Sequence, residues 1–357
     1  MNVHQVTQKD IAKGLGVTRI TVSKALSNSS DISAEMRKKV QQAAQDMGYI
    51  PNHTARNLHR NKTNTIGVVV PDVSNSFFSY AIGGIMDSAA NHGYHIILTV
   101  SRESADIERE NILTLLSHRV DGLLVAITQN TIDKTIYETV KKRNVPLVFF
   151  DRALEGIDFS SVGIDDKTAA ANLIAYTVEC GYKHIAHLAG SQTVAIGRDR
   201  LAGYMEALKK YGIPIEKDFI VYGGFDKSSG YGGCRKLLEQ GRRPEVIFAS
   251  NDRIAQGAYQ AIAEAGLKIP ADIGVVALGH SEFAELLSPT LTIIDSSPEI
   301  LGKQAMEELV HEMSGGALQG IHHRMLDTVL RKNHSLLPKH ALQTVRSNII
   351  PFTHRKG

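Results

Sequence analysis

Residues 18–26 (TRITVSKAL) carry side chains that could read DNA bases from one face of a helix. At about 100° per residue, the apolar side chains share one face, which can pack on a neighbouring helix: Val22, Ala25 and Leu26. The opposite face carries Arg19, Ile20, Ser23 and Lys24. Arginine and lysine can donate to the acceptors of guanine, and an isoleucine can contact a thymine methyl group. This face therefore predicts base contacts in the major groove.

Short hydroxyl side chains flank the same helix and suit a different part of DNA. Hydroxyls of this kind, like helix N-termini, hydrogen-bond phosphate oxygens, which orient a protein on the duplex without reading its sequence. The candidates are Thr7, Thr18, Thr21 and Ser23.

Three short helices are predicted to position these side chains. Thr7 and Asp10 form a capping pattern that opens the first helix, which residues 14–17 (GLGV) interrupt. Thr18 can cap the second helix, and a third begins at Ser33. Two helices joined by a tight glycine-containing turn and supported by a third describe a helix-turn-helix. The alternative is a three-helix bundle with a solvated charged face.

The distribution of charge favours a DNA-binding head. The 357 residues carry a net charge of +3, which alone argues against a nucleic-acid binder. Residues 1–64 hold ten lysines and arginines and four acids, a charge of +6, so the remainder carries −3. Such asymmetry suggests that only the head meets phosphate. Within the head, we interpret Arg37, Lys38 and Lys39 as a solvated face.

Residues 51–64 predict a linker that orders on binding. Pro51 stops the third helix and restarts the chain. Residues 52–60 can form one short helix, which is marginal in water on its own. The composition is basic and polar with one protruding leucine, Leu58, as in segments that fold on a partner.

Residues 65–335 alternate short apolar runs with helical patterns. This alternation predicts parallel sheets with helices on both faces, and the number of units exceeds one open sheet, so we expect two lobes. Ligands of such sheets bind beyond the carboxyl ends of the strands. Polar and aromatic residues follow several runs, as a polar pocket with a stacking face requires. Three of the acids are equally open to interpretation as helix N-caps: Asp72, Asp226 and Asp252.

Residues 6–58 resemble the DNA-binding head of the lactose/galactose repressor family. The resemblance runs without gaps through VTQKDIAKGLGVTRITVSKALSNSSDISAEMRKKVQQAAQDMGYIPNHTARNL. It implies that Arg19, Ile20 and Lys24 read operator bases. The implied phosphate or backbone contacts are Thr18, Thr21, Ser23, Ser27 and Asn52. A hinge helix is implied over Ala55, Arg56 and Leu58, with Leu58 wedged into the minor groove; an ordinary linker leucine is the alternative.

Residues 65–335 resemble the effector-binding core of the same family, which is similar to periplasmic sugar-binding proteins. The resemblance rests on IGVVVPDVSNSFF, DGLLV, VPLVFFDR, GYKHIAHLAG, GRDRLAGYMEAL, SNDRIAQGA and SPTLT. It implies a two-lobe α/β fold of parallel sheets with helices on both sides, attached to the all-α head. The implied effector contacts are Asn75, Phe77, Phe78, Asp151, Arg152, Arg200, Phe225 and Asn251, with Arg198 a weaker candidate than Arg200.

The resemblance also implies the domain boundaries. We expect a helix-turn-helix domain at 1–50, a hinge and linker at 51–64, an effector-binding core at 65–335 and a tail at 336–357. Chain crossings near Ser160, Leu291 and Asp327 would divide the core into an N-lobe, 65–160 plus 292–327, and a C-lobe, 161–291 plus 328–335.

One departure from the family pattern concerns the charge of the effector. The family usually has Gly-Phe-Asp-Asp after a late strand, and the first Asp often binds a ligand hydroxyl or amine; here residues 277–280 read ALGH. We expect the pocket to lose an acid and to gain a base, His280, beside Arg152 and Arg200. Guanidinium groups suit carboxylate or phosphate, which favours an anionic effector such as a sugar acid or phosphorylated sugar. The alternative is that His280 points away and the arginines pair with Asp151 or Asp199.

These features predict a sequence-specific transcriptional regulator that represses a carbohydrate or sugar-acid operon. One head reads too few base pairs to find a site in a genome, so we expect a homodimer on pseudo-palindromic double-stranded operator DNA. Lobe closure on an effector would change the spacing of the two hinges and so couple the sites. Either an inducer or a corepressor fits this scheme, and the sugar-responsive members of the family favour an inducer.

The rival interpretation is a cytoplasmic small-molecule-binding α/β enzyme or a solute-binding protein. The sequence has no dinucleotide fingerprint after a strand, no P-loop, no GxSxG and no HExxH, so we expect no catalytic residue and no cofactor. Scattered histidines and two cysteines without metal-binding spacing predict no metal site and buried thiols at Cys180 and Cys234. No signal peptide and no apolar run of ~20 residues is present, so we expect a cytoplasmic, nucleoid-associated protein.

The tail at 336–357 extends beyond the family core. Pro338 could start a short helix with Leu342, Val345 and Ile349 on one side, which is too short for a coiled coil. We therefore expect a loose basic end, with a tetramer-forming tail as the alternative.

Replacing Leu58 with glycine tests the hinge. The change removes the side chain that would open the central base step, so we expect operator affinity to fall while effector affinity stays unchanged. Gel shift and calorimetric titration measure the two affinities. Equal loss of both would contradict the expected separation of the two sites.

Overall fold

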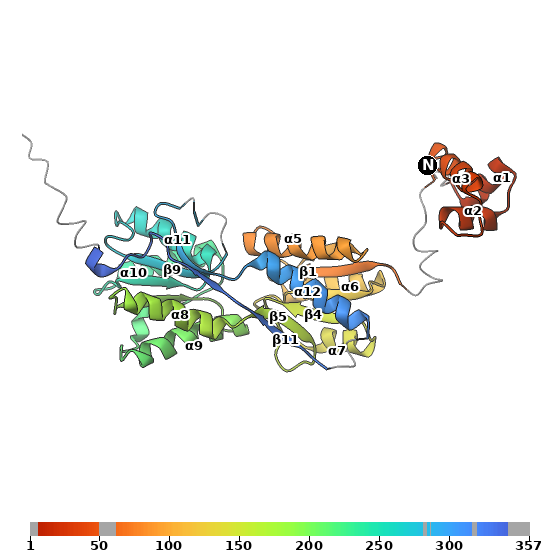
Figure 1. The fold of residues 1–357 in the computed structure, drawn as a ribbon. Coiled ribbons are helices and arrows are strands. Elements are labelled where there is room, and N and C mark those ends of the chain that lie inside the picture. The colour runs from red at the N-terminus through yellow and green to blue at the C-terminus, as the bar shows by residue number, and fades with distance from the viewer. Residues whose placement is uncertain (1–5, 50–61, 281–283, 286, 316–319, 342–357) are drawn as a thin grey trace, which may run out of the picture. The chain divides into compact units, whose positions relative to one another are not determined.

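The computed structural model describes the chain except for residues 1–5, 50–61, 281–283, 286, 316–319 and 342–357. The chain divides into two compact units, Met1–Thr63 and Asn64–Gly357. The first is a small all-α head and the second is a larger α/β body (Figure 1).

The head contains α1 (Gln8–Leu15), α2 (Arg19–Leu26) and α3 (Ala34–Asp46). A hydroxyl side chain caps the start of each helix: Thr7, Thr18 and Ser33. Thr7 N donates to Asp10 Oδ2 at 2.8 Å, which completes the expected capping box. Gly16 ends α1 with a φ of +67°, a left-handed conformation that glycine adopts without strain and that turns the chain tightly into α2.

A small apolar core joins the three helices: Ile11, Ala12, Val22, Ala25, Val40 and Ala44. Val22 and Ala25 have no exposed surface, whereas Ile20 on the opposite side of α2 is 66% exposed. The structure therefore confirms the division of α2 into an inner apolar face and an outer face.

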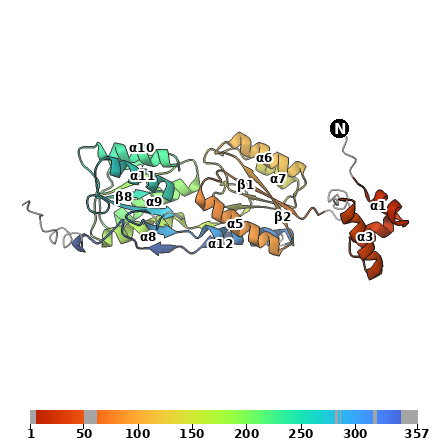
Figure 2. The same ribbon diagram turned by 90° about the horizontal axis from the view of Figure 1, so that it is seen from above.

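The N-lobe of the body is a six-stranded parallel sheet in the order β11-β5-β4-β3-β1-β2. Its strands are β1 (Thr65–Val70), β2 (His95–Val100), β3 (Gly122–Val125), β4 (Leu147–Phe150), β5 (Ser160–Ile164) and β11 (His323–Leu326). One face is covered by α5 (Ser76–Asn91) and α12 (Pro298–Met313), the other by α6 (Ala105–Ser117) and α7 (Thr135–Lys142) (Figure 2). Both faces are buried, so β1 reads as a continuous apolar run.

The C-lobe repeats this arrangement with a six-stranded sheet in the order β12-β10-β9-β8-β6-β7. Its strands are β6 (Ile185–Ala189), β7 (Ile220–Tyr222), β8 (Val246–Ala249), β9 (Gly274–Gly279), β10 (Thr292–Asp295) and the antiparallel β12 (Val329–Arg331). A 3-10 turn, Lys217–Phe219, precedes β7. One face packs against α8 (Asp166–Glu179) and α9 (Ala195–Lys210), the other against α10 (Lys227–Leu238) and α11 (Asp252–Glu264).

Two of the three crossings between the lobes follow Ser160 and Leu291 by a few residues, within the several residues to which they were predicted. β5 pairs with β4, so residues 161–164 belong to the N-lobe. β10 pairs with β9, so residues 292–295 belong to the C-lobe. The backbone groups of β5 and β10 are satisfied by pairing with β4 and β9, so the chain crosses to the other lobe only after each strand ends. The third crossing runs between β11 and β12, at residues 327–328.

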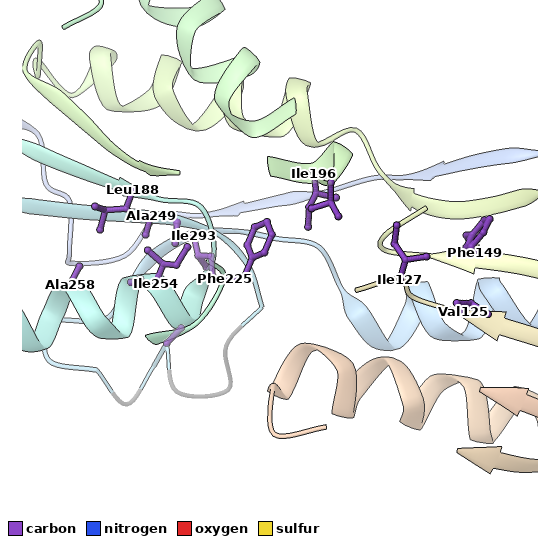
Figure 3. Close-up of a cluster of buried hydrophobic side chains, with 14 of the residues drawn as sticks. Val125, Ile127, Phe149, Leu188, Ile196, Phe225, Ala249, Ile254, Ala258 and Ile293 are labelled. Atoms are coloured by element: carbon purple, nitrogen blue, oxygen red, sulfur yellow. The ribbon is translucent and has the colours of Figure 1, made fainter. Parts of the chain in front are cut away.

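One apolar cluster extends through both lobes. It includes Ile127 and Phe149 from the N-lobe and Ile196 and Phe225 from the C-lobe (Figure 3). All four side chains are buried. The lobes are therefore in contact around the cavity described below.

The packed body extends beyond its expected end at residue 335. Leu336 is 1% exposed within the C-lobe core. Tyr182 donates a hydrogen bond to Leu337 O at 2.8 Å, and Lys339 Nζ lies 2.5 Å from Glu245 Oε1. The tail residues Leu342, Val345 and Ile349 lie outside the described residues.

Close packing of α5 on α12 requires glycine at position 302. A Cβ on Gly302 would overlap Ala81 O. We expect Gly302→Ala to lower the free energy of unfolding by about 1–3 kcal/mol, because the two backbones must move apart. Gly83→Ala is the matched control on α5, where a Cβ would meet no atom within 4 Å; it should stabilise by roughly 0.5–1 kcal/mol through helix propensity. Thermal unfolding compares the variants, and equal melting temperatures would contradict the close approach.

Candidate functional site

The outer face of α2 presents the predicted base-reading side chains to solvent. Arg19, Ile20, Ser23 and Lys24 are all exposed. Lys24 Nζ lies 2.7 Å from Asp31 Oδ2, and this hydrogen bond lowers the pKa of Asp31. An exposed pair of this kind contributes little to stability, so a guanine can compete for Lys24.

Several of the predicted phosphate contacts also hold the head together. Thr7 and Thr18 cap α1 and α2, and Thr18 Oγ1 lies 2.9 Å from Thr21 Oγ1. Ser27 Oγ donates to Lys24 O at 3.2 Å. A hydroxyl both donates and accepts, so these bonds leave capacity for a phosphate oxygen.

Two further predictions concern Arg37, which was interpreted as part of a solvated face, and the hinge residues. Arg37 is not simply solvated, because its Nη2 donates to Ser29 O at 2.9 Å and Ile32 O at 3.3 Å and so ties down the loop between α2 and α3. The candidates of the hinge lie outside the described residues: Asn52, Ala55, Arg56 and Leu58.

A cavity lies between the two lobes of the body. Its lining contains every predicted effector contact except His280: Asn75, Phe77, Phe78, Asp151, Arg152, Arg200, Phe225 and Asn251. The other lining residues are Ile196, Asp252 and Gly279. The lining residues lie at the carboxyl ends of strands in both sheets and at the starts of the helices that follow, where parallel sheets bind their ligands.

Two asparagines position aromatic rings in the cavity through helix caps. Asn75 caps α5, and its Oδ1 accepts from Phe77 N at 3.0 Å. Asn251 caps α11 and donates through Nδ2 to Phe225 O at 2.9 Å. The rings of Phe77 and Phe78 meet edge to face with centroids 5.3 Å apart. The local capping chemistry therefore fixes the aromatic wall.

Arg152 is held between aromatic rings of the two lobes. Its guanidinium carbon lies 5.6 Å from the ring centre of Phe78 and 5.0 Å from that of Phe225. Its Nη1 donates to Glu103 Oε1 at 2.8 Å, and the side chain is 4% exposed. Because the two rings belong to different lobes, the cation–π contacts draw the lobes together.

Arg200 is paired in the same way on the C-lobe side. Its Nε donates to Asp166 Oδ1 at 2.7 Å, and its Nη1 donates to Ser250 O at 2.6 Å. Burial raises the pKa of Asp166, although the Arg200 charge opposes the rise. Sequence reasoning missed Asp166 and Glu103. Each follows a strand, and the same signal that singled out other strand-end acids could have found both.

Asp151 lies in the cavity wall in a left-handed backbone conformation, with φ at +59°. Non-glycine residues rarely adopt this conformation, and such strain is concentrated at ligand sites. Burial raises the pKa of Asp151 to about 6, against the lowering effect of Arg152 and Arg200.

His280 is the predicted contact that does not line the cavity. Its Nδ1 lies 3.0 Å from Asp295 Oδ1, and Arg331 Nε donates to Asp295 Oδ2 at 2.8 Å. The hydrogen bond with Asp295 raises the pKa of His280. Although burial opposes it, the hydrogen bonds from His280, Ser297 N and Arg331 lower the pKa of Asp295 to about 2. The charge of His280 is therefore balanced outside the pocket.

Polar contacts also bridge the lobes beside the cavity. Arg253 Nη1 lies 2.6 Å from Asp72 Oδ2, which joins the start of α11 to the N-lobe. Arg198 Nη2 lies 2.6 Å from Glu155 Oε2. The weaker effector candidate Arg198 thus serves as a bridge and does not line the cavity.

The described residues contain no group of three or more His, Cys, Asp or Glu side chains able to hold a metal ion. No helix in the described part of the chain is both long and apolar enough to span a membrane. Cys180 and Cys234 are buried free thiols, as expected, and burial raises the pKa of Cys234 to about 12.

Comparison with known proteins covers both units. Residues 7–52 match the model of bacterial regulatory proteins of the lacI family, and residues 63–328 match periplasmic binding proteins and the sugar binding domain of the LacI family. The chain is 33% identical over 310 residues to the HTH-type transcriptional repressor CytR of Escherichia coli (strain K12), covering 87% of this chain and 90% of CytR. It is 32% identical over 316 residues to the ribose operon repressor of the same strain, covering 88% of this chain and 94% of that repressor.

A solved structure shows the same architecture. The lac repressor dimer bound to operator and the anti-inducer ONPF matches with a TM-score of 0.83 and 28% identity, covering 93% of this chain and 99% of that chain. Head and body are thus each matched in sequence, and together they are matched in structure. The chain therefore belongs to the lacI family of bacterial regulatory proteins, and it is a DNA-binding transcriptional repressor with an effector-binding domain rather than an enzyme.

Proposed function

We propose that this repressor controls a carbohydrate operon and that a small molecule bound between its lobes sets its affinity for the operator. The observation that carries the proposal is the cavity, whose lining comes from both lobes. A ligand there contacts both lobes at once, so its binding free energy depends on how they are arranged. A ligand-controlled switch requires such a dependence.

Operator recognition rests on the exposed face of α2. In this proposal Arg19, Ile20 and Lys24 read base edges. Phosphate contacts come from Thr7, Thr18, Thr21, Ser23 and Ser27, and the hinge contributes Asn52, Ala55, Arg56 and Leu58. A homodimer presents two such helices to a pseudo-palindromic duplex, which the lac repressor dimer bound to operator supports. The protein would act at the nucleoid in the cytoplasm, and a tetramer formed through residues 342–357 is the alternative assembly.

The cavity favours a neutral, hydroxyl-rich effector over the anionic effector that residues 277–280 suggest. The cations that an anion would need already have acidic partners: Arg152 pairs with Glu103, Arg200 with Asp166 and His280 with Asp295. Arg152 Nε has no hydrogen-bond partner among the described residues, but it lies 3.8 Å from Asp151 Oδ2, so a further acid already faces it. Phenylalanine faces suit the apolar side of a sugar ring, and buried carboxylates and amides suit its hydroxyls. The similarity to a ribose operon repressor agrees with a carbohydrate effector.

The bridges between the lobes are the proposed moving part. The Asp72–Arg253 and Arg198–Glu155 pairs join opposite lobes, so a rotation of one lobe breaks or remakes them. An effector that binds one lobe arrangement more tightly than the other shifts the protein towards that arrangement and so changes its affinity for the operator. The coupling free energy between two such sites is typically about 1–3 kcal/mol. We expect the effector to act as an inducer that releases the operator.

Arg19→Ala tests base reading on an operator obtained by in vitro selection. We expect operator affinity to fall by about 1–3 kcal/mol through the loss of guanine contacts, with a much smaller change on a scrambled duplex. Lys38→Ala is the control, because it removes the same charge from α3 and should weaken both complexes equally and slightly. Fluorescence anisotropy at one salt concentration measures the affinities of wild type and both variants for the two duplexes. Equal losses for Arg19→Ala on both duplexes would contradict a role in base reading.

Calorimetric titration with neutral sugars, including ribose, and with gluconate and ribose 5-phosphate tests the effector class. We expect a neutral sugar to bind and the two anions to remain without effect, since the arginines of the cavity are already paired. Binding of the anions alone would overturn this expectation and restore the anionic interpretation.

A further inference from the structure

Three acids follow strands at the cavity end of the body, and two of them have an evident structural task. Asp226 caps α10, and Asp72 pairs with Arg253. Asp252 does not cap α11, because Asn251 holds that position. The N-cap interpretation that was open for all three acids therefore holds for Asp226 and fails for Asp72 and Asp252, because Asn75 caps α5 and Asn251 caps α11.

The carboxylate of Asp252 is buried without a full set of partners. The residue is 2% exposed and lines the cavity. Its Oδ2 has no hydrogen-bond partner within the described part of the chain. A buried acceptor that lacks a donor is unfavourable, so its retention in a cavity points to a donor supplied from outside the protein.

Gly279 leaves this carboxylate open to the cavity. Both residues line the cavity, and a Cβ on Gly279 would lie 3.4 Å from Asp252 Oδ1. Any longer side chain at the end of β9 would stand against the carboxylate. The acid at this end of the cavity therefore comes from the first turn of α11.

Among the described residues, no cation forms an ion pair with Asp252. Arg253 pairs with Asp72, and His280 pairs with Asp295. Burial raises the pKa of Asp252 to about 7, and the smaller lowering effects come from backbone hydrogen bonds and from the His280 and Arg253 charges. Above pH 7 the carboxylate is ionised and can serve as a strong acceptor for a ligand donor.

We propose that Asp252 accepts a hydrogen bond from a hydroxyl group of a neutral effector and so determines effector specificity. The inference rests on the proposed function, because it takes the cavity as the effector site. A hydroxyl satisfies the unpaired Oδ2, whereas a carboxylate or phosphate in the same place is repelled by it.

Asp252→Asn tests the unpaired carboxylate in the ligand-free protein. Because the folded pKa of Asp252 lies above its unfolded value of about 3.9, stability is lost as the pH rises from about 4 through about 7. We expect Asp252→Asn to raise the melting temperature clearly at pH 8 and less at pH 5. Asp226→Asn is the control without this gain, because the pKa of Asp226 is lowered and asparagine caps a helix equally well. An unchanged or lower melting temperature of Asp252→Asn at pH 8 overturns the proposal.

The second measurement uses the neutral sugar that binds in the calorimetric panel. Asp252→Asn should lower its affinity about tenfold or more, because a neutral amide oxygen replaces a charged acceptor, and Asp226→Asn should not change it. Equal affinities for Asp252→Asn and wild type overturn the role of Asp252 and leave the proposed function standing. Binding of the anions alone overturns both. If no compound of the panel binds, the proposed effector class is wrong, and the melting temperatures alone test whether Asp252 is unpaired.

Discussion

Charge compensation in the buried space between the lobes is the constraint on which the effector cavity depends. A guanidinium group is stable there only with a carboxylate partner, because its desolvation is otherwise too unfavourable. Arg152 meets Glu103 from the loop after β2, and Arg200 meets Asp166 at the start of α8. These pairs lock separate strands and helices to one another at the floor of the cavity. They also balance the charge of the two arginines, whereas Asp252 lines the same cavity with an Oδ2 that has no hydrogen-bond partner among the described residues.

In the head, by contrast, the polar side chains on the outer face of α2 are exposed to solvent in the absence of DNA. Helix caps and a core of small side chains hold it together, and the outer face of α2 takes no part in that core. Its charge of +6 is compensated by phosphate rather than by the protein itself. The pairing of Lys24 with Asp31 is exposed and weak, so it can be exchanged for a base contact. The inner face of α2 thus serves stability, whereas its outer face stays exposed.

The two lobes of the body are joined by contacts of two kinds. A buried apolar cluster runs from one lobe into the other, and it changes little when the lobes slide by a small distance. Ion pairs such as Asp72–Arg253 are specific to one arrangement, because their distances change as soon as the lobes rotate. An effector that inserts donors and acceptors between the lobes therefore competes with these pairs and selects an arrangement. Arg152, Phe78 and Phe225 line the cavity, so a ligand bound there can also compete with the cation–π contacts that join the lobes.

The sequence by itself determined the features that local patterns encode. Capping residues and apolar spacing predicted the helices of the head, and residues at strand ends predicted the wall of the cavity, because parallel strands bring their carboxyl ends to one edge. Only the tertiary structure decided which charges in that wall are free. Glu103, Asp166 and Asp295 reach their partners from other elements of the fold, and no local pattern encodes such pairing. The same holds for the lobe boundaries at β5 and β10, since a strand belongs to the sheet with which it hydrogen-bonds. Local sequence patterns therefore predict the position of the cavity, whereas its charge depends on side chains that meet only after folding.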